Sequence, residues 1–465
     1  MIKNFLVFVV YRVSSTSFKI MDKKTYHIFI IGCQMNISDG ERVANYLDSY
    51  GYQEEKDIYR ADLVIFLTCG VRYSAESRIY GLIPNIKKKN PKVKIVLSGC
   101  LVVREDIKKS MGKMIDYWLP IVDLPSFYNL LQGKEPLKSD GKKFSPSEYL
   151  KEPAKYKSKY SAFVPIGNGC DNFCSYCFVP YARGREVYRS ADEILEEVYS
   201  LIKKGYKEIT LIAQNVNSYK FGEIDFPKLL QKVNNLKGNF WLRFATSHPK
   251  DMSDDLIRAM SKCEKLCHHV HIAVQSGDDE ILEKMNRKYN RQHFIDLIKK
   301  IRKNLNKNIA NTKNEIWQAP VSITTDIIVG FPGETKKQFL NTAKLFKKLN
   351  FDMAYIARFS PRPMTAAAQM DDDVSPKEKK EREEYLMKIL RKTALKNNKK
   401  YINKIVEVLV DGKKEKTGKY FGHTKSNKVV KFESSDKILS GEIVLIKIKK
   451  VKDFGLEGVL VNNKK

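Results

Sequence analysis

Three short apolar segments in the first hundred residues each run directly into a cysteine. They end at Cys33, Cys69 and Cys100, and residues 39–51 between the first two carry apolar side chains at helical spacing. Strand–helix alternation predicts a parallel sheet, and ligands gather at the carboxyl ends of such strands. A buried thiol could explain any one of the three cysteines. Their equivalent positions favour one shared ligand at one sheet edge.

A second set of cysteines lies within eight residues. Cys170, Cys174 and Cys177 are spaced x3 and then x2. Thiolates are the usual ligands of iron–sulfur clusters, and a cluster of four irons normally takes four of them. Three ligands leave one iron open to a small molecule. A partial zinc site or buried thiols are alternatives, but zinc sites usually add a second close pair of cysteines or histidines, and none follows here.

Two further cysteines mimic a metal site. Cys263 and Cys267 precede a histidine-rich stretch that includes His269 and His271. Both histidines fall in a predicted strand, where alternation fixes their orientation by packing. We therefore predict a structural role for this group.

The composition limits the kinds of partner that the chain can have. The 465 residues include 84 Lys and Arg against 54 Asp and Glu, a net charge of +30, and no apolar run of membrane-spanning length. The charge favours nucleic acid as a partner, although a solvated lysine coat is the alternative. Eight clustered cysteines indicate metal ligation in a reducing compartment, which predicts a cytoplasmic protein.

The chain divides into five predicted parts. Residues 1–22 are an extension, and Met21 is the expected start of translation; residues 23–132 form the N-terminal parallel-sheet α/β domain, and residues 133–160 a linker. Residues 161–398 form a partial (β/α)6 barrel, with a surface insertion at 304–320 and a charged helix at 376–400. Six strands are expected there, at residues 162–166, 208–213, 240–245, 269–274, 321–329 and 353–359.

The last part, residues 399–465, reads as a small all-β barrel. Five short strands with glycine turns are expected, at residues 405–410, 418–423, 429–432, 442–451 and 457–461. Its aromatic side chains could stack on bases of a single strand, although aromatics in strands more often pack in the core. The aromatic and histidine residues concerned are Tyr420, Phe421, His423 and Phe432.

These motifs resemble the radical S-adenosylmethionine (radical SAM) methylthiotransferases. The x3–x2 spacing with Tyr176 before the last cysteine is similar to the radical SAM signature, the upstream triplet is similar to that of the methylthiotransferases, and the C-terminal barrel resembles a TRAM domain. The resemblance runs from about Lys24 to Val461. Within the family, several strings resemble the branch that modifies tRNA: residues 32–36, 214–219, 246–249, 274–277 and 329–335.

The resemblance implies two [4Fe-4S] clusters, one on each cysteine triplet, and S-adenosylmethionine (SAM). It implies sulfur and methyl insertion at C2 of N6-isopentenyladenosine beside the tRNA anticodon, by a 5′-deoxyadenosyl radical. The tRNA anticodon stem-loop, an electron donor and a sulfur source would be partners of a monomer. By position in the matching motifs, the SAM contacts are expected at Gln214, Ser247, Gln275 and Gly330.

Alternatives and departures remain. The same chemistry could act on N6-threonylcarbamoyladenosine in tRNA or on an aspartate of a ribosomal protein, and a non-catalytic iron–sulfur RNA-binding protein is the alternative from another class. Met364 stands where the family normally has glycine, and Ala273 where proline is common. Because glycine often serves a turn with unusual dihedrals, these positions put loop geometry in question rather than chemistry.

Overall fold

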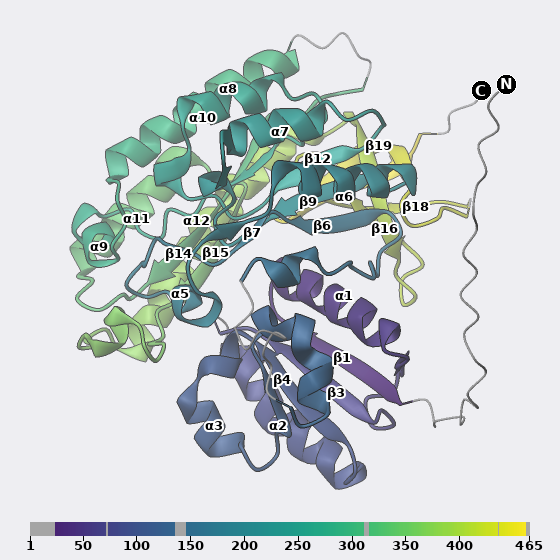
Figure 1. The fold of residues 1–465 in the computed structure, drawn as a ribbon. Coiled ribbons are helices and arrows are strands. Elements are labelled where there is room, and N and C mark those ends of the chain that lie inside the picture. The colour runs from purple at the N-terminus through teal and green to yellow at the C-terminus, as the bar shows by residue number, and fades with distance from the viewer. Residues whose placement is uncertain (1–23, 71–72, 135–145, 311–315, 436, 462–465) are drawn as a thin grey trace, which may run out of the picture.

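The computed structural model describes residues 24–70, 73–134, 146–310, 316–435 and 437–461 (Figure 1). The predicted start at Met21 lies outside these residues. The first unit is a parallel sheet of order β2-β1-β3-β4-β5 with helices on both faces. Its elements are β1 Thr25–Ile31, α1 Gln34–Ser49, β2 Gln53–Glu54, β3 Leu63–Thr68, α2 Tyr73–Lys89, β4 Lys94–Gly99, α3 Glu105–Met111, β5 Tyr117–Leu119 and α4 Phe127–Leu131.

Strand β3 explains why this unit is a two-sided sheet. Its side chains are all buried. Alternate residues serve different cores: Ile65 and Leu67 pack on the α1 side, while Val64 and Phe66 pack on the α2 side. A continuous apolar run is the pattern expected of a parallel strand covered on both faces.

The central unit is an open barrel of six parallel strands in chain order. Two three-stranded sheets are joined by bridges at Leu242–Leu266 and Ser247–Ile272. The predicted partial (β/α)6 barrel is confirmed, although the strand expected at residues 269–274 ends at His271. The strands are β6 Ser161–Pro165, β9 Glu208–Ile212, β12 Trp241–Phe244, β13 His269–His271, β14 Ser322–Val329 and β15 Met353–Arg358.

Helices cover the outside of this barrel (Figure 1). Several of them begin with side-chain caps: Ser190, Asp225, Ser253 and Thr335 each accept a hydrogen bond from a backbone N–H of the first turn. The helices are α5 Val179–Arg183, α6 Ala191–Lys203, α7 Phe226–Asn234, α8 Asp254–Lys262, α9 Asp279–Lys284, α10 Arg291–Ala310 and α11 Lys336–Leu349.

The third unit is a closed five-stranded barrel of order β16-β17-β18-β20-β19. The predicted all-β barrel is confirmed, and so is the charged helix that leads to it, α12 Pro376–Asn398. That helix is followed by the short helix η7 Lys399–Tyr401. The strands are β16 Ile405–Lys413, β17 Tyr420–His423, β18 Val429–Glu433, β19 Ile443–Lys452 and β20 Gly455–Leu460.

Core packing, rather than base stacking, holds for two of the aromatics. Tyr420 and Phe432 are buried in the barrel core, with ring centroids 5.6 Å apart. A barrel this small needs large inward side chains to fill its interior. His423 is engaged between the two barrels by Glu208 and Asp411. Phe421 is half-buried.

Two segments expected to be irregular pack against the folded units. In the described part of the predicted linker, Tyr149 and Leu150 are buried in the core of the first unit. In the predicted surface insertion, Trp317 donates its backbone N–H to Ile405 O at 3.0 Å, and its ring lies 4.8 Å from that of Tyr401. The last residues of the insertion, 316–320, therefore dock against the C-terminal barrel. The predicted domain boundaries themselves stay a prediction.

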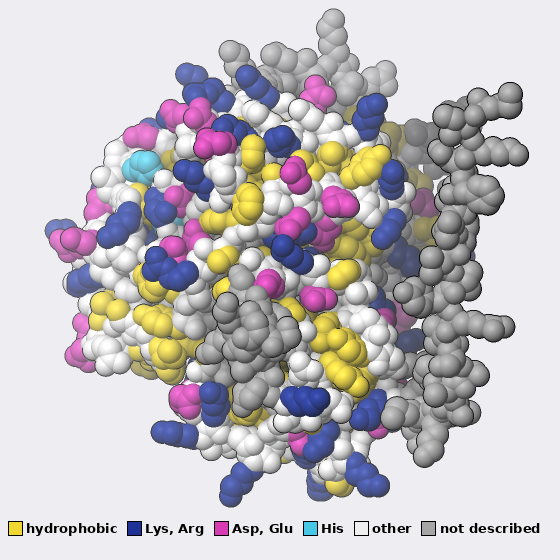
Figure 2. Space-filling model, in the orientation of Figure 1, with side chains coloured by type: hydrophobic (Ala, Val, Ile, Leu, Met, Phe, Trp, Pro, Cys, Tyr) yellow, Lys and Arg dark blue, Asp and Glu magenta, His cyan; other side chains and the backbone are white. Residues whose placement is uncertain are grey.

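Surface charge is dispersed on the face in Figure 2, where Lys and Arg side chains alternate with acidic ones. This matches the lysine-coat interpretation for that face. Within the described ranges, no helix is long and apolar enough to cross a membrane.

Candidate iron–sulfur and SAM site

The first cysteine triplet lies at one sheet edge, as expected. Cys33 precedes α1 directly after β1, Cys69 follows β3, and Cys100 begins a short helical turn after β4. Strands β1, β3 and β4 are neighbours in register, with Ile31 opposite Thr68 and Thr68 opposite Gly99. Cys69 and Cys100 are buried and Cys33 is exposed.

The strand ends in this triplet are held tightly together. Asn36 is fully buried; its Nδ2 donates to Thr68 O at 3.1 Å, and its Oδ1 accepts from Cys33 Sγ at 3.3 Å. Gly99 has φ 79°, and a Cβ there would lie 2.4 Å from Thr68 O. Only glycine fits this position, which keeps β4 close enough to β3 for Cys69 and Cys100 to be neighbours.

The second triplet sits on a loop that is anchored from several sides. Phe173 within it has φ 45°, a costly conformation for a residue other than glycine. Asn286 Nδ2 donates to Phe173 O at 2.9 Å, and Ser175 Oγ donates to Lys284 O at 2.7 Å. Gln214 Oε1, at the end of β9, accepts from Gly169 N at 2.6 Å. The surroundings thus impose the loop's strained shape.

Two of the loop thiols are shifted toward their protonated form by burial. Burial raises the pKa of Cys170 to about 11 and that of Cys177 to about 12. Two donors face the sulfurs: Asn172 Nδ2 lies 3.4 Å from Cys170 Sγ, and Arg287 Nη1 lies 3.4 Å from Cys174 Sγ. Iron would displace the thiol protons, and these donors would then hydrogen-bond the ligating sulfurs.

The segments that carry the two triplets pack against one another across the interface of the first two units. Helix α5, just after Cys177, packs on the turn that begins at Cys100. A Cβ on Gly70 would lie 3.1 Å from Cys100 Cβ and 2.7 Å from the ring of Phe178, the residue after Cys177. The sequence could not show this contact, because the segments are far apart in the chain.

A buried ion pair links the same two segments. Arg183 on α5 donates to Asp39 Oδ2 on α1 at 2.6 Å, and both side chains are almost fully buried. Burial alone would lower the pKa of Arg183, but Asp39 and the thiols of Cys100 and Cys33 raise it well above its ordinary value. Sequence reasoning missed Arg183, since nothing distinguishes it from the neighbouring arginines.

Across the described ranges, no three His, Cys, Asp or Glu side chains converge closely enough to hold one metal ion. A four-iron cluster takes its thiolates on separate irons and so needs a wider spacing. The other histidines are engaged elsewhere: His269 and His271 contact Thr324 Oγ1 at 2.9 and 3.0 Å. Burial raises the pKa of both Cys263 and Cys267, as suits structural residues.

The four expected SAM contacts lie at carboxyl ends of barrel strands, the end that carries the cysteine loop. Gln214 is occupied in holding that loop. Ser247 is buried, and its Oγ has no hydrogen-bond partner among the described residues, so it is free for a ligand. Gln275 has φ 68° and Gly330 has φ 66°. A Cβ on Gly330 would clash with the side chain of Lys379. Irregular backbone at this end is typical of a ligand site.

Met364 and Ala273, the two departures from the family pattern, have different structural effects. Met364 has φ 70° and is exposed, so this chain adopts an unusual turn here without glycine. Ala273 donates its N–H to Ser247 O at 3.4 Å, a contact that proline could not make.

Family models match three stretches of the chain. Residues 25–119 match "Uncharacterized protein family UPF0004", residues 164–346 the radical SAM superfamily, and residues 399–461 the TRAM domain. Among solved structures, the radical SAM methyltransferase TsrM from Kitasatospora setae gives a TM-score of 0.52 at 13% identity, covering 74% of this chain and 75% of that one. OxsB with aqua-cobalamin bound gives 0.51 at 10% identity, covering 87% and 65%. Identities this low show the fold alone.

Sequence relatives extend over nearly the whole chain. The tRNA-2-methylthio-N(6)-dimethylallyladenosine synthase of Clostridium perfringens (strain SM101 / Type A) is 40% identical over 454 residues, which are 95% of this chain and 98% of the relative. That of Thermoanaerobacter sp. (strain X514) is 40% identical over 449 residues, 94% of this chain and 92% of the relative. The chain therefore belongs to the family of the tRNA-2-methylthio-N(6)-dimethylallyladenosine synthases, which are radical SAM enzymes.

Proposed function

We propose that this enzyme adds a methylthio group to C2 of N6-isopentenyladenosine next to the tRNA anticodon. The carrying observation is that two three-cysteine sets, on different units, lie on segments that pack against one another. One set suits radical generation and the other sulfur delivery. The names of the relatives support the substrate.

The residues fit two [4Fe-4S] clusters. Cys170, Cys174 and Cys177 would hold one, and the other would be held by Cys33, Cys69 and Cys100. When bound, the first cluster with SAM supplies a 5′-deoxyadenosyl radical able to attack an unactivated C–H bond, and the second supplies the sulfur. Three ligands per cluster leave one iron for SAM and one for the sulfur source.

Side chains of the protein would position the cofactors and adjust the properties of the clusters. Arg287 donates to Cys174 Sγ, and a positive charge at a ligating sulfur favours the reduced state of a cluster. Ser247 offers its unpaired hydroxyl to SAM, and Gln214 fixes the start of the cysteine loop. The buried Arg183–Asp39 pair holds the two sets of thiols in register.

Nucleoside mass spectrometry of tRNA from cells lacking the gene tests the substrate. We expect loss of 2-methylthio-N6-isopentenyladenosine and accumulation of N6-isopentenyladenosine, with other modified nucleosides as the internal control. Unchanged 2-methylthio-N6-isopentenyladenosine would overturn the substrate.

Two variants separate the two clusters. In anaerobically reconstituted enzyme, Cys174→Ala should abolish cleavage of SAM to 5′-deoxyadenosine. Cys69→Ala should retain cleavage and lose sulfur insertion. Product formation by the Cys69 variant would contradict a functional second cluster.

We also propose the cellular setting. The enzyme would act as a cytoplasmic monomer on the anticodon stem-loop, with a separate electron donor and sulfur source. Size-exclusion chromatography with light scattering, with and without the RNA, tests the stoichiometry.

A further inference from the structure

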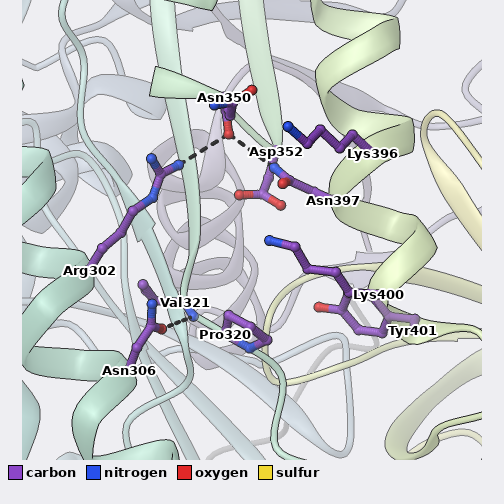
Figure 3. A pocket seen from close by; sticks show the side chains of 10 residues that line it. All are labelled: Arg302, Asn306, Pro320, Val321, Asn350, Asp352, Lys396, Asn397, Lys400 and Tyr401. Atoms are coloured by element: carbon purple, nitrogen blue, oxygen red, sulfur yellow. Dashed lines mark hydrogen bonds between the residues drawn. The ribbon is translucent and has the colours of Figure 1, made fainter. Parts of the chain in front are cut away.

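A pocket of about 240 Å³ lies at the opposite end of the central barrel from the cysteines (Figure 3). Val321 and Asp352, which line it, come just before β14 and β15, whereas the cysteine loop lies at the carboxyl ends of the strands. Strand β14 has 8 residues, so the two ends are about 25 Å apart at the usual rise per residue. Lys400 and Tyr401 place the pocket at the first residues of the TRAM domain.

Three basic side chains line the pocket. Figure 3 shows Arg302 of α10 on one side, and Lys396 of α12 and Lys400 of η7 on the other. None of the three forms an ion pair with any acidic residue that the structure describes. Arg302 makes one hydrogen bond, from Nη2 to Asn350 O at 3.1 Å, and its remaining donors are available.

The one carboxylate in the pocket is already neutralised. Asp352 Oδ1 accepts from Lys428 Nζ at 2.7 Å, and its Oδ2 accepts from Ile323 N at 2.9 Å. Both members of this ion pair are buried. With Asp352 paired, the three free cations give the pocket a surplus positive charge, and this excludes a cation as the occupant.

Burial makes the surplus charge costly without a ligand. Arg302 is half-buried, and burial lowers its pKa below the ordinary value, which Asp352 only partly offsets. A guanidinium without an anionic partner in such a place is the arrangement that a phosphate satisfies with paired hydrogen bonds. The two exposed lysines would add point charges at the pocket's rim.

We propose that this pocket binds a backbone phosphate of the RNA substrate. The inference rests on the proposed function, since RNA supplies the phosphate. The separation from the cysteines assigns the contact to a nucleotide several positions away from the reacting base. Such a contact would orient the RNA on both barrels without reading its sequence.

Salt-dependent binding of an anticodon stem-loop RNA to the cluster-loaded full-length enzyme tests this. Lys400→Gln and Lys396→Gln should each weaken binding several-fold, on the order of five, and reduce the slope of log affinity against log salt by about 1 between about 50 and 200 mM KCl. Lys388→Gln is the matched control, because Lys388 is an exposed lysine of the same helix outside the pocket. It should leave the slope unchanged.

Arg302→Gln should behave like the lysine variants. Because Arg302 is half-buried, this variant could unfold, and the two exposed lysines then still provide the test. Inorganic phosphate, followed by ³¹P line broadening, separates the sources. One outcome would overturn the RNA assignment in favour of a free-phosphate site. In that outcome, Lys400→Gln removes binding of inorganic phosphate but binds the RNA as tightly as Lys388→Gln does. Slopes equal to the control in all pocket variants would overturn the site. Wild-type enzyme that cleaves SAM but does not bind this RNA would overturn the proposed substrate, and the inference with it.

Discussion

His423 should make the contact between the central barrel and the TRAM domain pH-dependent. Its Nε2 lies 2.9 Å from Glu208 Oε1 at the start of β9, and its Nδ1 lies 2.9 Å from Asp411 Oδ2 on β16. Burial alone would lower its pKa, and so would Arg243. The hydrogen bonds to Asp411 and Glu208 outweigh both and raise the pKa from 6.5 to about 9.

The sign and size of the effect follow from this shift. A pKa raised by folding adds stability that is complete below the unfolded value of 6.5 and is lost as the pH rises through 9. The full contribution is about 3 kcal/mol, and about 2 kcal/mol remains at pH 7.5. The pKa of Glu208, against burial, is lowered to about 2 by His423 and Arg243. The shifts of Glu208 and His423 describe one and the same interaction, so the shift of Glu208 is not added to the contribution of about 3 kcal/mol.

Trp241 offers a local probe, since its ring centroid lies 6.1 Å from that of His423. Urea unfolding of the full chain, followed by tryptophan fluorescence, should give an unfolding free energy about 3 kcal/mol lower at about pH 9.5 than at about pH 6. His423→Gln should remove most of that difference. The control is His293→Gln, an exposed position on α10. Equal free energies at the two pH values in the wild type, or the same pH dependence in His423→Gln, would refute the reasoning.

Three further predictions concern the site. Arg183→Gln leaves Asp39 buried without its cation and should cost about 3–5 kcal/mol of unfolding free energy, measured by urea denaturation, whereas exposed Arg185→Gln should change little. Met364→Gly relieves a positive φ that costs about 1–2 kcal/mol. Glycine also adds entropy to the unfolded chain, which offsets part of this gain, so urea denaturation should show an unfolding free energy higher by about 0.5–1 kcal/mol. Ser247→Ala should raise the KM for SAM while iron content stays unchanged; an unaltered KM would contradict the proposed contact.

The parts of the fold that the sequence predicts are those with a strong local signal. Apolar runs that end in cysteines predict the N-terminal sheet and its ligand edge, because a strand covered on both faces has to be apolar throughout. The alternation of strands and helices predicts the six-stranded barrel.

Tertiary contacts decide the remainder. Tyr420 and Phe432 have the same local pattern whether they face bases or the barrel core, so their burial could not be predicted. Tyr149 and Trp317 lie in segments without periodicity, and only their partners fix them. Similarly, Arg183 is separated from Asp39 by 144 residues, and no local rule connects the two.

The interface between the first two units is as important for function as the cysteines themselves. Contacts between units of one chain usually permit relative motion, yet sulfur transfer needs reacting atoms held within a fraction of an ångström. Asp39–Arg183 is buried, and Arg42 on the same helix α1 makes a second pair with Glu197 of α6 at 3.4 Å. Because a buried charge left unpaired is far more costly than an exposed one, these pairs favour a single relative placement of the two units. That placement brings the two sets of thiols together.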